Sequence, residues 1–158
     1  MAYRDLLEAL KERQSQLKGK VQARADCLAL QASLSDRLVP GWFVEILSQF
    51  KLCGAELELA EEEDASGLGV SMGWLELDGI LSEAKECQPG IAIVPMGFLP
   101  VGSDLTGSGD PYFLDLRLDS DDPLLVRVPH DYAMGPTYPL EKIEVVCPLS
   151  NFIQKVQA

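Results

Sequence analysis

The only histidine in the chain, His130, is followed directly by Asp131, so any histidine-dependent catalysis would have to use this side chain. A general base of this kind would activate a serine or cysteine, but no nucleophile motif stands beside His130 in the sequence. The alternative is a histidine that orients a loop through a backbone hydrogen bond, and the residue pattern favours it. We therefore predict a protein that is not an enzyme and has no catalytic residue.

A glycine-rich stretch at residues 102–110 holds two aspartates that could ligate a cation. A calcium loop of the EF-hand type needs oxygen ligands at alternate positions, where this chain has Leu105 and Gly107. A dinucleotide-binding loop needs a helix after its glycines, whereas a strand pattern follows here. We therefore predict a tight turn without metal or cofactor, in which Gly107 and Gly109 adopt positive φ and Asp110 caps the turn.

The chain carries 25 acidic and 13 basic residues, which gives a formal net charge of −12. Such a chain is repelled by the phosphates of nucleic acid and by anionic membranes, so neither is expected as a direct ligand. The excess charge either serves solubility alone or complements a partner with a basic surface, whose association it would accelerate.

Two acidic runs lie in predicted turns, at residues 61–64 and 119–122. No two of these carboxylates stand out as the pair that glycoside hydrolysis needs, so the runs are either solvated turns or an acidic rim that contacts a cationic partner. Two tyrosines in the irregular stretch 129–139 are candidates for partly exposed interface residues. The predicted partner-binding set is Glu61, Glu62, Glu63, Asp64, Asp119, Asp121, Asp122, Tyr132 and Tyr138.

Zinc-ligand spacing is absent, because no CxxC pair occurs among the four cysteines, which are Cys27, Cys53, Cys87 and Cys147. The first residues, MAYRDLLEALKERQ, are amphipathic and charged and lack the apolar centre of a signal peptide. No apolar run approaches the roughly 20 residues that span a bilayer. We expect reduced, mostly buried thiols in a cytoplasmic protein that does not bind membranes.

Apolar residues at helical spacing predict helices over residues 3–17, 21–32 and 42–50, the last opened by Pro40-Gly41. The period then changes to two at residues 56–59, which is typical of a half-buried strand. Helices followed mostly by strands predict an α+β domain whose sheet is antiparallel or mixed.

The rest of the chain is predicted to hold one more internal helix and mostly strand and turn. Asp78 would cap that helix and Pro89-Gly90 would end it, after which the apolar run 91–94 opens the strand-rich half. Strand patterns are present at residues 72–77, 96–101, 111–118, 124–128 and 143–147. The third and fourth of these are predicted to form a hairpin across an acidic turn, and Ser150 would cap a short terminal helix.

No internal repeat or linker interrupts the chain, and its 47% hydrophobic and 24% charged residues are typical of a globular protein. We therefore predict one domain over residues 1–158, with a helical N-terminal extension (1–35) and a core (36–156). An exposed apolar stripe on the first helix would look the same in the sequence as a buried one, so the oligomeric state stays open.

Several segments, taken in order, resemble the Smi1/Knr4-like proteins of the SUKH superfamily. PGWFVEILSQF at residues 40–50 resembles the family's first conserved helix, and MGWL at 72–75 with the following helix resembles its central strand and helix. The most specific match is GFLPV at 97–101 followed by GSGDPYFLD at 107–115, which is similar to the family's apolar strand, small-residue loop and acidic strand.

Two further segments continue the same resemblance. VRVPHD at residues 126–131 is similar to a family strand that ends in a histidine–acidic pair, and SNFI at 150–153 is similar to the closing helix. The resemblance covers residues 36–156. It implies an α+β domain with a curved sheet and helices packed beside it, whose structural motif residues here are Gly107, Gly109, Asp110, Asp115 and His130.

The resemblance also implies a function in binding. In bacteria, members of this superfamily are commonly immunity proteins that bind and neutralise secreted toxins, often nucleases, while other members are interaction hubs in signalling. A nuclease must carry positive charge to hold nucleic acid, so an acidic blocker suits it. We expect a cytoplasmic immunity protein bound stoichiometrically to a basic toxin domain. The alternative is a non-catalytic regulatory or scaffold module with a partner that is not a toxin.

Overall fold

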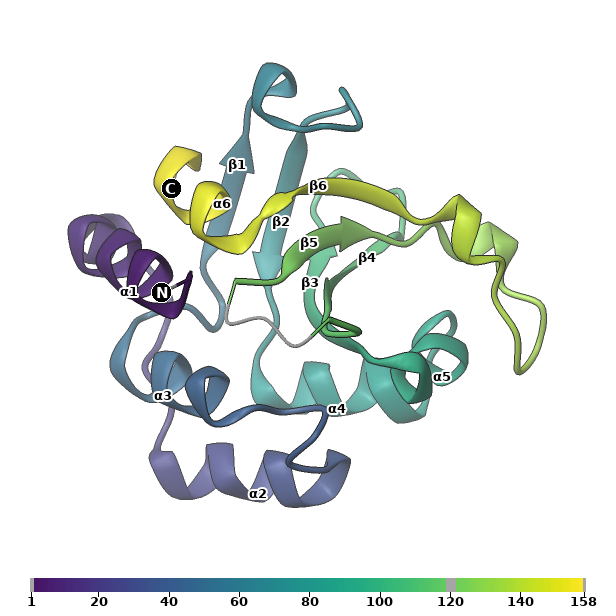
Figure 1. Cartoon of the computed structure of the whole chain (residues 1–158), viewed down its shortest axis with the longest axis horizontal. Coiled ribbons are helices and arrows are strands. Elements are labelled where there is room, and N and C mark those ends of the chain that lie inside the picture. Colours follow the sequence, from purple (N-terminus) through teal and green to yellow (C-terminus); the bar gives the residue numbers. More distant parts are fainter. Residues whose placement is uncertain (1, 119–121, 158) are drawn as a thin grey trace.

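Six antiparallel strands form one sheet whose spatial order follows the order of the sequence (Figure 1). The computed structural model describes residues 2–118 and 122–157. The strands are β1 (Glu56–Leu59), β2 (Val70–Trp74), β3 (Phe98–Asp104), β4 (Pro111–Asp115), β5 (Leu124–Arg127) and β6 (Glu144–Pro148). Because each strand pairs with the next one along the chain, the sheet is a meander, and it curls into a half-barrel.

The α-helices of the described residues are α1 (Ala2–Arg13), α2 (Arg24–Leu34), α3 (Gly41–Gln49), α4 (Leu77–Lys85), α5 (Gly90–Ile93) and α6 (Leu149–Lys155). Short 3-10 turns are η1 (Gln14–Gln16), η2 (Glu61–Glu63), η3 (Val94–Met96), η4 (His130–Tyr132) and η5 (Leu140–Lys142). In Figure 1, α1 and α6 lie side by side at one side of the sheet, and α2, α3 and α4 lie below it. None of the described helices has the length and apolar character needed to cross a bilayer.

The first helix belongs to the main hydrophobic core. Leu6 and Leu10 of α1 are fully buried, and α1 packs along α6. The Arg13 guanidinium donates a hydrogen bond to the carbonyl oxygen of Val156, which fastens these two helices at their ends. α2 packs on α3 and α4, with Leu30 buried in the same core. The apolar stripe of α1 is therefore part of the domain interior and not a free surface.

Strand β4 is buried on both of its faces. Tyr112 and Leu114 join the main core, while Phe113 joins a second cluster with Phe98 and Val126 on the other side of the sheet. Successive side chains of a strand point to opposite faces, so a strand that is apolar on both faces must lie between two packed layers. This double burial makes β4 the centre of the sheet and a rigid support for the loops at its ends.

The structure confirms the α+β class and several predicted elements. α3 begins directly after Pro40, and β1 covers residues 56–59 as the two-residue period indicated. β4 and β5 form the predicted hairpin, paired from Tyr112 opposite Arg127 to Asp115 opposite Leu124. The last strand and the terminal helix are also present, as β6 and α6.

The apolar run at residues 91–94 was wrongly predicted to open a region of strand and turn. It forms α5 and the start of η3, where Ile93 and Ala92 are buried in the second cluster against Phe98. A four-residue apolar run has no readable period, so tertiary packing decides its structure. The predicted loop at 102–110 also starts late, because β3 continues through Asp104.

Both predicted helix caps are wrong. α4 begins at Leu77 with Glu76 as its N-cap residue, which places Asp78 inside the first turn. α6 begins at Leu149, so Ser150 is inside the helix. The carboxylate of Asp122 accepts hydrogen bonds from the Ser150 backbone N–H (2.8 Å) and hydroxyl (2.6 Å), and it satisfies the helix end from a distant loop.

Candidate partner-binding groove

A groove of about 720 Å³ crosses the sheet and is lined by residues of all six strands and of the loops around residues 106–110 and 129–132. Leu59, Val70 and Tyr112 are among its lining residues and belong to the main core as well. Carboxylate residues from several elements also line the groove, and they are Glu58, Glu61, Asp104, Asp110, Asp131 and Glu144. With six carboxylates and one guanidinium, Arg127, the lining carries a formal net charge of −5.

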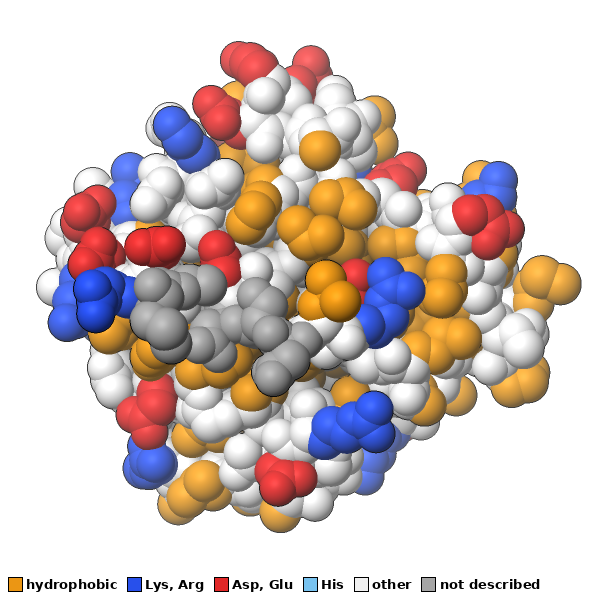
Figure 2. Space-filling model, in the orientation of Figure 1, with side chains coloured by type: hydrophobic (Ala, Val, Ile, Leu, Met, Phe, Trp, Pro, Cys, Tyr) orange, Lys and Arg blue, Asp and Glu red, His pale blue; other side chains and the backbone are white. Residues whose placement is uncertain are grey.

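Two of the groove carboxylates are free to meet an incoming cation. Glu58 and Glu61 are exposed and form no ion pair with any residue that the structure describes. The backbone of Glu58 is fixed by two hydrogen bonds with Gln157, so its side chain projects from a rigid strand. Glu61 begins the acidic η2 turn, and acidic side chains gather over this β1–β2 end of the molecule in Figure 2.

Arg127 is the buried cation of the groove, with only 8% of its side chain exposed. Its guanidinium donates hydrogen bonds to acceptors that come from three separate segments, and these acceptors are Tyr112 Oη, Ser66 Oγ, Glu144 Oε1, Asp64 Oδ2 and the carbonyl oxygen of Gly69. Burial disfavours the charged guanidinium, but the bonds to Tyr112, Glu144 and Asp64 outweigh it and raise the pKa of Arg127. All five N–H groups have a partner, so Arg127 is a structural anchor.

Asp64 was predicted to contact a partner, and its burial makes that prediction wrong. Its side chain is fully buried and pairs with Arg127 at 3.2 Å, while its other oxygen accepts hydrogen bonds from the Ser66 N–H and hydroxyl. The loop between β1 and β2 is therefore tied to β5, and the Ala65 N–H extends the tie to Val146 of β6. This anchoring holds Glu61, Glu62 and Glu63 outward as an exposed acidic turn.

The loop after β3 is built around Asp104, where the sequence prediction had named Asp110. One carboxylate oxygen of Asp104 accepts hydrogen bonds from the backbone N–H groups and the hydroxyls of Thr106 and Ser108. Burial works in the opposite direction, but these four bonds lower the pKa of Asp104. Gly107 and Gly109 adopt the predicted positive φ, 96° and 79°.

Asp110 instead binds His130, which begins the 3-10 turn η4 after β5. One of its oxygens accepts the His130 backbone N–H at 3.0 Å and lies 2.7 Å from the ring Nδ1. The other ring nitrogen, Nε2, lies 3.1 Å from the carboxylate of Asp131. The hydrogen bond with Asp110 raises the pKa of His130 more than burial lowers it, and the negative charges of both aspartates add to the rise.

The two predicted interface tyrosines differ in exposure. Tyr132 lines the groove and is 43% exposed, with the Lys142 ammonium 4.8 Å from its ring centre. Tyr138 is only 4% exposed and donates a hydrogen bond from its hydroxyl to the carbonyl oxygen of Pro129. The prediction that Tyr138 is an exposed contact is therefore wrong, because this tyrosine packs in the second hydrophobic cluster.

The second acidic run contributes little that can be assigned to a surface. Asp119 and Asp121 lie outside the described residues. Asp122 is half-buried and holds the start of α6 through Ser150, so its carboxylate serves the fold. The prediction that Asp122 contacts a partner is not supported by this geometry.

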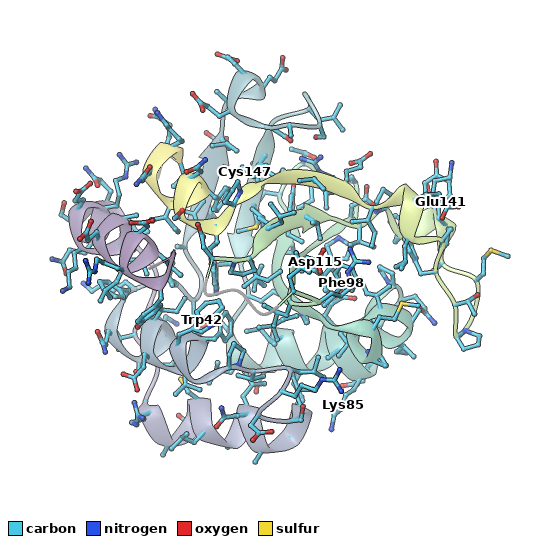
Figure 3. All side chains as sticks on the ribbon, viewed as in Figure 1. Trp42, Lys85, Phe98, Asp115, Glu141 and Cys147 are labelled. Carbon is cyan, nitrogen blue, oxygen red and sulfur yellow. The ribbon has the colours of Figure 1, made fainter. Side chains whose placement is uncertain are left out.

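Asp115, at the end of β4, forms a two-pronged ion pair with Arg117 at 2.9 and 2.8 Å. Arg117 also lies over the ring of Phe98, with its guanidinium carbon 4.8 Å from the ring centre, and Phe98 and Asp115 lie close together in Figure 3. Burial raises the pKa of Asp115, but the contacts with Arg117 outweigh it and leave the pKa below its usual value. This pair closes the outer end of the β3–β4 ladder, away from the groove.

One serine pattern that sequence reasoning missed is GVSMG at residues 69–73, which has the spacing of a nucleophile motif. Ser71 lies inside β2 opposite Glu58, not at the strand-to-helix turn where such a nucleophile is exposed. Within residues 2–118 and 122–157, no hydrogen bond joins Ser71 to His130, and no group of three or more His, Cys, Asp and Glu side chains is arranged to hold a metal ion. What the groove offers is an excess of negative charge among its lining residues, beside apolar side chains of the main core.

Comparison with models of protein families, with curated proteins and with solved structures gives no match for this chain.

Proposed function

We propose that this protein acts by binding a basic protein in the acidic groove, and that it neutralises a secreted toxin domain as a cytoplasmic immunity protein. The observation that carries this proposal is the groove itself, whose lining holds six carboxylates and one guanidinium that is buried and fully bonded. An array of this sign attracts cationic side chains and repels phosphate, which matches a protein partner and not a nucleic acid.

Two further properties support the same proposal. The half-barrel with helices beside it is of the kind that the Smi1/Knr4-like resemblance implies, and in that group binding rather than catalysis is the shared activity. Burial raises the pKa of Cys53 and of Cys147 to about 12 in each case, so both thiols stay protonated and unreactive near neutral pH. Inert reduced thiols are what a cytoplasmic protein is expected to carry.

The partner is tested through the product of the adjacent gene. If that product is a basic toxin domain, co-expression with this protein is expected to protect the host cell, and the two proteins are expected to co-purify in equal amounts. Binding should weaken as salt is added, because exposed charges are screened. Absence of both protection and co-purification would contradict the immunity function.

The groove itself is tested with a pair of double variants that remove equal charge. Glu58→Gln with Glu61→Gln removes the two free groove carboxylates and is expected to weaken the complex about tenfold or more, mainly through slower association. Glu62→Gln with Glu63→Gln removes two exposed charges of the same turn that lie outside the groove lining, and it is expected to weaken binding less than about threefold. Titration calorimetry or surface plasmon resonance measures both, and equal losses would show that the groove is not the interface.

A basic partner that confers no toxicity, but whose binding shows the same contrast between the two double variants, would favour a regulatory module over an immunity protein.

A further inference from the structure

His130 places both of its ring nitrogens against carboxylates that face the groove. Nδ1 lies 2.7 Å from Asp110 and Nε2 lies 3.1 Å from Asp131. The ring is also held close to the backbone, since a Cβ atom at Gly109 would lie 3.3 Å from its Cε1. Asp110 and Asp131 both line the groove, so the imidazole bridges two parts of the groove wall.

The chemistry of the two contacts defines the protonation state that they need. An ionised carboxylate only accepts hydrogen bonds, and a neutral imidazole has one N–H donor. Both contacts can therefore be hydrogen bonds only when the ring carries two protons and a positive charge. A neutral ring keeps only one of these hydrogen bonds. We expect it to keep the bond to Asp110, because this carboxylate also accepts the His130 backbone N–H at 3.0 Å.

The His130 ring contacts two carboxylates, and the one cation recorded against its 3-10 turn among the described residues is Lys142, whose ammonium lies 4.8 Å from the ring centre of Tyr132. Asp110 reaches it from the loop before β4, and Asp131 follows it in η4. Tyr138, whose hydroxyl bonds to Pro129, has a pKa raised by burial first and then by the charge of Asp110. Among the described residues, no lysine or arginine forms an ion pair with either aspartate.

We propose that His130 is a proton switch on the partner groove. Its imidazolium pairs with the carboxylates of Asp110 and Asp131, and when the ring loses its proton a basic side chain of the partner binds these carboxylates in place of the imidazolium. This inference rests on the proposed function of the groove and names how that site is regulated. Asp131 is the carboxylate that exchanges the imidazolium for a partner side chain most readily, because its side chain is 82% exposed.

Thermodynamic linkage makes this competition reciprocal. A proton on His130 weakens the binding of a cation at the two aspartates, and a bound cation makes that proton easier to lose by the same factor. Partner binding is therefore expected to release a proton and to tighten as pH rises through the His130 transition. A groove without the switch would show no such dependence near neutral pH.

The test uses the full chain, a hexa-arginine peptide as the probe, and the fact that His130 is the only histidine. The His130 ring gives a single titrating Cε1–H signal in an NMR spectrum. Saturating probe is expected to move its midpoint to lower pH by about half a unit or more, and the probe is expected to bind about three- to tenfold tighter at pH 8.5 than at pH 6.

Two substitutions fix the switch in opposite states. His130→Asn keeps a donor near the Nδ1 position but cannot be charged, so its affinity for the probe is expected to change less than about twofold between the two pH values. His130→Arg keeps a permanent cation beside the aspartates, so it is expected to bind the probe weakly at both. Circular dichroism and the unfolding midpoint establish that each variant is folded before binding is measured.

The possible results separate the switch from the groove. Probe binding that Glu58→Gln with Glu61→Gln weakens, but that shows the same pH dependence in His130→Asn as in the original protein, overturns the switch and leaves the groove intact. If the titration midpoint of His130 does not move when the probe binds, the switch is likewise overturned and the groove is left intact. No binding of the probe at either pH overturns the groove as a cation site, and the switch with it.

Discussion

Replacing Arg127 by methionine is expected to lower the free energy of unfolding by about 3–5 kcal/mol, which is the usual cost of removing one partner from a buried ion pair. Methionine fills much of the same volume but donates no hydrogen bond. Asp64, whose side chain is fully buried, would then keep an uncompensated charge inside the protein. Urea unfolding followed by circular dichroism measures the loss.

The substitution is expected to loosen the β1–β2 loop before it unfolds the whole domain. Arg127 bonds Ser66 and Gly69 as well as Asp64, so its loss releases the whole β1–β2 loop from the sheet. The amide of Ala65, which donates to Val146, should then lose protection from hydrogen exchange. Since this loop carries Glu61, partner affinity should fall together with its protection.

Two comparisons make this expectation specific. Arg117→Met removes an arginine with an equally good pair to Asp115, but one that is 46% exposed, and it should cost no more than about 1 kcal/mol. Combining Arg127→Met with Asp64→Asn should cost less than the sum of the single changes, because the second change removes the stranded charge. Additive losses would mean that the two side chains do not depend on one another.

Replacing Glu83 by glutamine is expected to stabilise the protein at pH 8 by about 1–2 kcal/mol and to have no such effect at pH 4.5. Burial raises the pKa of Glu83 to about 7, although a hydrogen bond from the Gly90 backbone lowers it in part. One of its carboxylate oxygens, Oε2, is inaccessible to water and has no hydrogen-bond partner among the described residues. The full shift would correspond to about 3 kcal/mol, and solvent screening of a half-buried group reduces it.

The direction of this pH dependence follows from proton binding. In the unfolded chain Glu83 loses its proton near its ordinary pKa of 4.5, whereas in the folded protein it holds the proton until about pH 7. The unfolded state therefore binds fewer protons between these values, and the stability contributed by Glu83 falls as pH rises from about 4.5 to about 7. Glutamine is neutral throughout, so its advantage appears across that range and stays constant above it.

A nearby surface glutamate provides the matched control. Glu86→Gln removes the same charge just beyond α4 from an exposed position, and it should change stability by less than about 0.5 kcal/mol at either pH. Unfolding free energies of both variants and the original protein at pH 4.5, 6 and 8 complete the comparison. A gain for Glu83→Gln that persists at pH 4.5 would show that packing, and not charge, is responsible.

The elements that sequence reasoning predicted are those whose structure depends on a local pattern. The apolar spacing of α3, the two-residue period of β1 and the hairpin of β4 and β5 each need only neighbouring residues to be recognised. The run at 91–94 has no such pattern, and its helix depends on what packs around it.

The candidate site was harder to predict because its organising residues act over long separations. Arg127 stands in a strand beside apolar neighbours and looks like an exposed residue of an alternating pattern, yet Asp64 and Gly69 bind it from about 60 positions away. Asp64 sits in a run of four acidic residues that reads uniformly as surface, and only its distant cation selects it for burial. The charge of the groove was therefore predictable, but not which carboxylates form it.

In the turn between β3 and β4, the sequence predicted the kind of turn but not which aspartate caps it. Asp104 and Asp110 flank the same glycines, and either side chain could cap the turn by the same chemistry. Asp104 does so because Thr106 and Ser108 fold back onto it, and Asp110 is left free for a histidine 20 positions later. No local rule distinguishes these two roles.

The packing of α1 against α6 has a consequence for how the protein is made. The ribosome synthesises α1 before α6, yet the two helices pack together, and Leu6 and Leu10 share one hydrophobic core with Phe152 and Ile153. A nascent chain that has not yet released α6 presents an amphipathic helix with its apolar side in water. Such a chain is a natural client for chaperones, and it can complete its core only after α6 has emerged from the ribosome.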